Sequence, residues 1–202
     1  MKPDHNHFMK RAIALAEESM EEGNGPVGCV IVKHGQVMGE GRNLVQTSGD
    51  PTAHGETLAI RNAAAQHGTP DLFGCALYSS MEPCPMCCWA ILETGIATLV
   101  LGARHARFRT TEMGNYSVEA LVAMTGRKLE IVHGVREQEC EDLRYAALER
   151  AVRLARQGSA DGERGTKLPD ARTAFPADGD RVGGVLGASD TLCAWFRRLR
   201  KP

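Results

Sequence analysis

Two short groups of residues limit the folds open to this 202-residue chain more than any other feature of its sequence. Residues 54–56 read His-Gly-Glu, and residues 83–87 read Pro-Cys-Pro-Met-Cys. Each group is weak evidence alone, because a lone histidine is usually a surface or core residue and a C-x-x-C pair can be a redox pair. Both groups are predicted at the start of a helix that follows a strand. The fold is therefore expected to bring two helix starts together.

The residue types in these groups are those of a catalytic zinc site. A helix N-terminus favours negative charge and lowers the pKa of a thiol, which makes Cys84 and Cys87 good thiolate ligands. With His54 they supply three ligands and leave the fourth tetrahedral position open, as in catalytic rather than structural zinc sites. We predict one Zn²⁺ per subunit at these three residues, with Cys88 outside the coordination sphere.

Glu56 is the candidate catalytic residue. The two groups match the H-x-E and P-C-x-x-C signature of zinc deaminases, in which the glutamate is not a metal ligand. Zinc lowers the pKa of a bound water towards about 7, and the resulting nucleophile attacks a ring carbon that carries an amino group. Glu56 would accept the proton of the water and pass protons to the ring nitrogen and to the departing ammonia.

The bulk composition favours a small neutral ligand. A formal charge of -1 and a pI near 6.7 give no global reason to bind nucleic acid or a membrane surface. The sequence has no apolar run of signal-peptide or membrane-spanning length, so we expect a cytoplasmic protein. Seven cysteines without a secretory signal argue against a disulfide framework. Four of them are predicted to be packing residues: Cys29, Cys75, Cys140 and Cys193.

Hydrophobic periodicity predicts a three-layer α/β/α sandwich, because strands and helices alternate after an initial hairpin. Asp50 is predicted to be the N-cap of the second helix, with Pro51 in its first turn. The expected helices are 5–22, 50–68, 83–95, 117–124 and 136–156, and the expected strands are 27–32, 36–42, 75–79, 98–101 and 128–132.

One domain is expected over residues 1–156, and the composition changes after it. Residues 157–190 are rich in glycine and aspartate and poor in large apolar side chains, which predicts a flexible tail. Residues 191–202 are predicted to form a short amphipathic basic segment, with Trp195 and Phe196 on its apolar face. Truncation after Arg156 is expected to leave a folded, zinc-loaded and active protein.

Further motifs resemble the cytidine deaminase superfamily, in its branch of tRNA adenosine, guanine and fungal-type cytosine deaminases. The resemblance extends over residues 8–148. It implies a central five-stranded mixed sheet in the order 2-1-3-4-5, a homodimer or higher homo-oligomer, and a hydrogen bond from Asn43 to the substrate ring. The alternative for Asn43 is a turn-forming residue. The motifs are Gly-Pro-Val-Gly at 25–28, Gly-Arg-Asn at 41–43, Asp-Pro-Thr-Ala-His at 50–54 and Glu-Pro-Cys at 82–84.

Gly55 departs from most of that branch, which has alanine between the histidine and the glutamate. Fungal-type cytosine deaminases share the glycine, and there the backbone N–H at this position holds the carbonyl of the base. The resemblance therefore implies substrate binding by Gly55. The alternative is the loss of a methyl group without functional meaning.

The segment after the fourth strand bears on the substrate. Residues 105–111 do not resemble the corresponding stretch of tRNA adenosine deaminases, and the pI is near neutral, so a free nucleobase is favoured over tRNA. A cytosine- or isoguanine-like edge is favoured and guanine is a further candidate. Arginines at 104, 107 and 109 and in the last helix could instead form a basic face for tRNA adenosine-to-inosine deamination. A non-catalytic zinc-stabilised binding module ranks last, because Glu56 is present.

Overall fold

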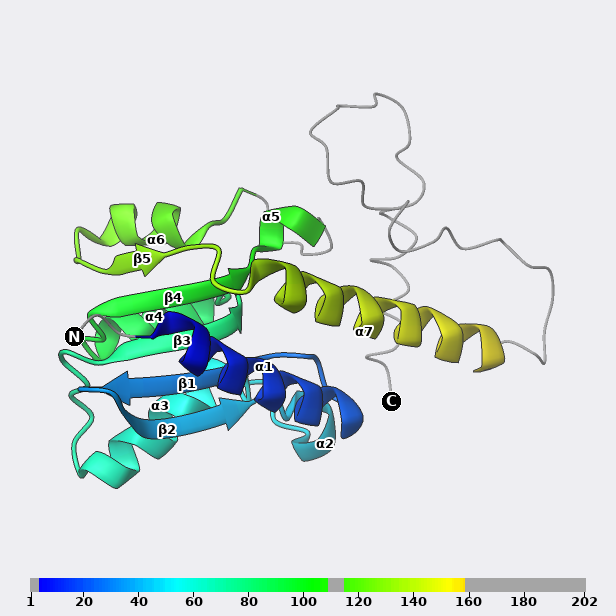
Figure 1. Cartoon of the computed structure of the whole chain (residues 1–202), viewed down its shortest axis with the longest axis horizontal. Coiled ribbons are helices and arrows are strands. Elements are labelled where there is room, and N and C mark those ends of the chain that lie inside the picture. The colour runs from blue at the N-terminus through cyan, green and yellow to red at the C-terminus, as the bar shows by residue number, and fades with distance from the viewer. Residues whose placement is uncertain (1–3, 109–114, 159–202) are drawn as a thin grey trace.

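The computed structural model describes residues 4–108 and 115–158 of the chain (Figure 1). The predicted tail at 157–190 lies outside these residues except for its first two positions, which end the last helix. The predicted segment 191–202 lies wholly outside them. None of the helices within the described ranges is long and apolar enough to cross a membrane.

The elements alternate much as the hydrophobic pattern predicts. In chain order they are α1 (His5–Glu21), β1 (Gly28–Lys33), β2 (Gln36–Arg42), α2 (Val45–Ser48), α3 (Gly55–His67), β3 (Ala76–Met81), α4 (Pro85–Glu93), β4 (Thr98–Ala103), α5 (His105–Phe108), α6 (Val118–Thr125), β5 (Glu130–Val132) and α7 (Glu137–Gly158).

The strands form one mixed sheet in the order β2-β1-β3-β4-β5, which confirms the expected topology. β1 is antiparallel to β2 and to β3, whereas β3, β4 and β5 are parallel. The predicted hairpin between β1 and β2 turns at His34 and Gly35, which have φ values of 52° and 79°. Two successive residues with positive φ match the right-handed twist of the flanking strands.

Helices cover both faces of the sheet and enclose two hydrophobic cores. Along β1, Val30 packs with α1 and α7 on one face, while Ile31 packs with α3 and α4 on the other. Successive side chains of a strand point to opposite faces, so a central strand covered on both sides is apolar throughout. The three-layer α/β/α sandwich is confirmed, and Figure 1 shows α1 and α7 on one side of the sheet.

Local bonding explains where the elements differ from expectation. Asp50 is not the N-cap of α3, because its carboxylate accepts hydrogen bonds from the backbone N–H and hydroxyl of Thr52, both at 2.7 Å. The N-cap is His54. The short helices α2 and α5 were not expected, since four residues are too few to show a helical period.

β3 continues to Met81, two residues further than predicted, because its two serines are satisfied inside the fold. Ser79 Oγ donates to the carbonyl of Met81 at 2.6 Å, and Ser80 Oγ accepts from the N–H of Gly28 at 3.1 Å. The parallel strands β3 and β4 end together, with Met81 paired to Ala103. Glu82 and Arg104, the first residues after these two strands, are therefore neighbours in space.

Candidate metal centre and active site

His54 and Cys84 are the N-cap residues of α3 and α4, and neither side chain makes a capping hydrogen bond. Their backbone carbonyls accept the first helical hydrogen bonds, from Leu58 at 3.0 Å and from Cys88 at 2.8 Å. N-cap positions usually carry Ser, Thr, Asp or Asn, whose side chains bond the free N–H groups of the first turn. Here neither the imidazole nor the thiol caps its own helix.

The two helix starts bring three ligand atoms together. His54 Nδ1 lies 3.6 Å from the sulfur of Cys84 and 3.5 Å from that of Cys87, and the two sulfurs are 3.6 Å apart. Around tetrahedral Zn²⁺, bond lengths of about 2.3 Å to sulfur and about 2.0 Å to nitrogen separate the ligand atoms by about 3.5–3.8 Å. The donor set and its spacing therefore fit zinc.

This is the one group of three such ligands found within residues 4–108 and 115–158. Cys88 is not part of the group, and its fully buried side chain packs in the core between the sheet and α4. Cys29, Cys75 and Cys140 are buried as predicted, and Cys193 lies outside the described residues.

The two thiols of the site share a proton unequally. Hydrogen bonding with Cys87 and with His54 lowers the pKa of Cys84 to about 4, although burial opposes this. The pKa of Cys87 is raised above its usual range, because its proton is held by Cys84 and its side chain is buried. One ligand is thus already a thiolate at neutral pH, and the other must lose a proton to bind a metal.

Glu56 lies in the first turn of α3 and is only 3% exposed. Burial raises the pKa of its carboxyl group to about 7, and the negative charge of Cys84 adds to this effect. Its own backbone N–H, His54 and Cys87 act in the opposite direction. A carboxyl group with such a pKa beside a metal site can both take and give a proton near neutral pH.

Asn43 follows β2, and its two amide atoms have different surroundings. Oδ1 accepts a hydrogen bond from the N–H of Val45 at 3.0 Å, so Asn43 does form a turn. Its backbone carbonyl accepts from the hydroxyl of Ser19 at 2.8 Å. Within the described part of the chain no hydrogen bond uses Nδ2. The turn-forming role thus leaves one donor available.

Gly55 occupies a tight position. A Cβ atom built there would lie 3.0 Å from the carbonyl oxygen of Val27 and 3.4 Å from the sulfur of Cys29. The first distance is tighter than about nine in ten real Cβ contacts, so an alanine would press on the backbone just before β1. Tight packing therefore favours glycine over alanine at position 55.

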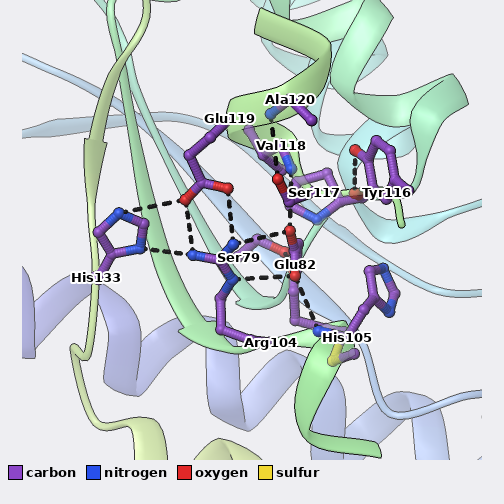
Figure 2. A network of polar contacts seen from close by, with 12 residues as sticks. Ser79, Glu82, Arg104, His105, Tyr116, Ser117, Val118, Glu119, Ala120 and His133 are labelled. Carbon is purple, nitrogen blue, oxygen red and sulfur yellow. Dashed lines mark hydrogen bonds and ion pairs between the residues drawn. The ribbon is translucent and has the colours of Figure 1, made fainter. Parts of the chain in front are cut away.

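Glu82, two residues before Cys84, accepts four hydrogen bonds, although no pattern in the sequence indicates a role for it. Figure 2 shows its carboxylate among Arg104, His105 and Val118. No periodic pattern marks such a residue, because its partners lie 22 to 36 positions away in the chain.

Among the described residues, Arg104 and Arg107 of the predicted basic face are paired with carboxylates. Arg104 bonds Glu82 and Glu119, and Arg107 pairs with Glu141 at 3.2 Å. Arg109, which was grouped with them, and Glu112 lie outside the described residues.

A model of the cytidine and deoxycytidylate deaminase zinc-binding region matches residues 2–103. The guanine deaminase of Bacillus subtilis is 48% identical over 103 residues, which cover 50% of this chain and 66% of that enzyme. The match thus spans just under two thirds of that relative. A tRNA-specific adenosine deaminase of Buchnera aphidicola is 34% identical over 155 residues, which cover 77% of this chain and 94% of that enzyme.

A solved structure from a study of A-to-I editing by tRNA:A34 deaminases has a similar fold. It superposes with a TM-score of 0.60 at 30% identity, and the match covers 68% of this chain and 98% of that one. The family model ends at Ala103, with β4. The segment that follows β4 is therefore outside the matched zinc-binding region.

Proposed function

The chain belongs to the cytidine and deoxycytidylate deaminase zinc-binding family, and from this premise we propose that it hydrolytically deaminates a free nucleobase or a related amino-heterocycle. The observation that carries the proposal is the buried Glu56 beside a set of three zinc ligands with the spacing of a tetrahedral site. Two thiolates and one imidazole leave a coordination position open, which is the arrangement of a catalytic zinc.

The zinc ion, when bound, supplies a water nucleophile at neutral pH, because it lowers the pKa of that water to about 7. The chain's own contribution is proton transfer by Glu56, whose pKa lies near 7. Its carboxylate accepts a proton from water and delivers one to the ring nitrogen, and a second transfer protonates the leaving amine. Overall, water and the amino-heterocycle give the oxo-heterocycle and ammonia.

Two groups would orient the ring. Nδ2 of Asn43 and the backbone N–H of Gly55 would both donate to an oxo group of the substrate. Cytosine and isoguanine carry an amino group, a ring nitrogen and an oxo group along one edge, which suits these donors. Guanine is a further candidate, and the identity to a guanine deaminase supports it.

The resemblance to the family also supports a homodimer or higher homo-oligomer, which light scattering would measure.

A tRNA adenosine-to-inosine deaminase is the second candidate. The likeness to a tRNA-specific adenosine deaminase over 94% of its length favours it. Two observations oppose it: Arg104 and Arg107 are neutralised by carboxylates within the described fold, and the net charge is -1. Binding of tRNA rests largely on the neutralisation of phosphates by free basic side chains. A non-catalytic binding module is the third candidate, and the presence of Glu56 opposes it.

The deciding experiment is ammonia release from cytosine, isoguanine, guanine, their nucleosides and a tRNA anticodon stem-loop. The zinc-loaded Glu56→Gln variant serves as the control for contaminating activity. We expect a free base to be the best substrate. Inosine formation in the stem-loop that is faster than deamination of any base would favour the second candidate. Zinc binding without turnover of any substrate would favour the binding module.

A further inference from the structure

Glu82 is a buried carboxylate whose hydrogen-bonding capacity is filled by the protein. Its side chain is 1% exposed, and each oxygen accepts two hydrogen bonds. Oε2 accepts from Nε of Arg104 at 3.0 Å and from the N–H of His105 at 2.9 Å. Oε1 accepts from the guanidinium of Arg104 at 3.1 Å and from the N–H of Val118 at 3.0 Å. Four charge-assisted bonds hold this carboxylate in one place.

These donors come from two elements that follow β4 in the chain. Arg104 and His105 lie at the junction of β4 and α5, and Val118 is the first residue of α6 (Figure 2). A separate bond joins the same regions, because the hydroxyl of Tyr116 donates to the carbonyl of Pro83 at 2.8 Å. Glu82, where the chain leaves β3, is therefore held both by residues at the end of β4 and by a residue at the start of α6.

The anchored segment leads directly into the metal site. Glu82 is two residues before Cys84, and Cys84 stands between Pro83 and Pro85. Each proline ring holds φ near -65°, so the backbone on both sides of Cys84 has little freedom. A displacement of Glu82 would consequently move the sulfur of Cys84 rather than be absorbed by the intervening chain.

We propose that Glu82 is a positioning residue, which sets the place of Cys84 in the zinc site by fixing residues 82–84 to the end of β4 and the start of α6. Groups that orient metal ligands in this indirect way typically change metal affinity by about 10- to 100-fold when they are mutated. The proposal concerns the zinc site alone and holds whichever heterocycle is the substrate.

Glu119 provides a matched control, because it is a second carboxylate that contacts the same guanidinium of Arg104 from the more exposed side. Glu119 accepts two bonds from Arg104, both at 2.8 Å, but its side chain is 43% exposed. His133 contacts the same guanidinium at 2.9 Å. Loss of the Glu119 charge leaves all four bonds to Glu82 intact. It should also cost little stability, because an exposed ion pair contributes little to the free energy of folding.

The test uses the full chain loaded with Co²⁺ in place of Zn²⁺, because cobalt absorption reports the geometry of the thiolate ligands without any turnover. In Glu82→Gln the new NH₂ group faces donors, so the bonds to Arg104, His105 and Val118 cannot all form. We expect an altered cobalt spectrum and loss of zinc to a chelator at least about tenfold faster. Glu119→Gln should keep the spectrum and a loss rate within about twofold.

A second variant keeps the test valid if Glu82→Gln does not fold. Val118→Pro removes one N–H donor to Glu82 and leaves all charges in place, and proline is accepted at the first position of a helix. Ser117, which precedes it, is already extended, with φ -142° and ψ 159°. Faster zinc loss in this variant supports the proposal. A lower melting temperature with an unchanged cobalt spectrum and zinc-loss rate, in either variant, would show that Glu82 only stabilises the fold and would overturn it.

Discussion

The sulfur of Cys84 lies 3.6 Å from Nδ1 of His54, although the two residues begin different helices and are 30 positions apart in the chain. Neither side chain caps its own helix. The contact therefore exists because β2 and β3 deliver α3 and α4 to the same end of the sheet. The ligand set therefore depends on the packing of the two helices and not on either helix alone.

Cys84→Ser and Cys87→Ser should each lose zinc, because the serine hydroxyl is a poor ligand for this metal in place of a thiolate. Cys88→Ser should keep about one zinc per chain, since Cys88 lies outside the ligand group. Metal analysis of the purified variants measures this. Zinc loss in Cys88→Ser together with retention in Cys87→Ser would reverse the assignment.

Glu56→Gln should lower kcat by about 100- to 10,000-fold, the usual contribution of a general acid–base group. The amide has nearly the shape of the acid, so zinc content should stay the same and substrate affinity should change by less than about tenfold. Steady-state kinetics, metal analysis and calorimetry separate the three quantities. A variant that kept most of its activity would exclude Glu56 as the proton carrier.

Zinc affinity should rise about tenfold, rather than a hundredfold, for each pH unit between about 7 and 8, above the ordinary titration range of an imidazole ligand. Cys84 has a pKa lowered to about 4 and is already a thiolate there, whereas the pKa of Cys87 is raised and its proton must leave. Binding becomes weaker as the pH falls, because protons compete for Cys87. Competition titrations in the Glu56→Gln background, which removes the other nearby titrating acid, measure this slope. The release of two protons for each zinc bound would contradict the unequal sharing of the proton between Cys84 and Cys87.

Asn43→Asp should separate the turn-forming role of Asn43 from its proposed role in substrate binding. The aspartate keeps an oxygen to accept from the N–H of Val45, so the turn and the folding stability should be retained. It loses the Nδ2 donor, and kcat/KM should fall by about tenfold or more, the cost of one hydrogen bond to the substrate. Thermal unfolding and kinetics on the best base test this. A kcat/KM equal to that of the unmodified protein would show that Asn43 acts only as a turn-forming residue.

Gly55→Ala should destabilise the protein by about 1–3 kcal/mol, the usual cost of inserting a methyl group into a tight site. The new Cβ would lie 3.0 Å from the carbonyl of Val27. Gly25→Ala is the control, because its nearest neighbour would be 3.6 Å away, an ordinary contact. Urea unfolding of both variants gives the comparison. Equal stability of the Gly55→Ala and Gly25→Ala variants would show that tight packing is not the reason for glycine at position 55.

Local patterns in the sequence were sufficient for the α/β class, most element boundaries and the candidate zinc ligands, whereas the sheet order was implied by the resemblance to the deaminase family. Apolar periodicity reflects which side of an element is buried, and both faces of this sheet are covered. The H-x-E and P-C-x-x-C groups each place their reactive side chains within one helical turn. Such information is carried by neighbouring residues and is readable without coordinates.

Only the tertiary structure decided the features that depend on contacts between distant segments. Asp50 has the residue type and position of an N-cap, yet its carboxylate bonds Thr52 and leaves that place to His54. Glu82 has an ordinary acidic side chain in the sequence, but the parallel ends of β3 and β4 bring it against Arg104. The physical reason is that a hydrogen bond depends on positions in space, whereas the patterns of a sequence record only what neighbours along the chain share.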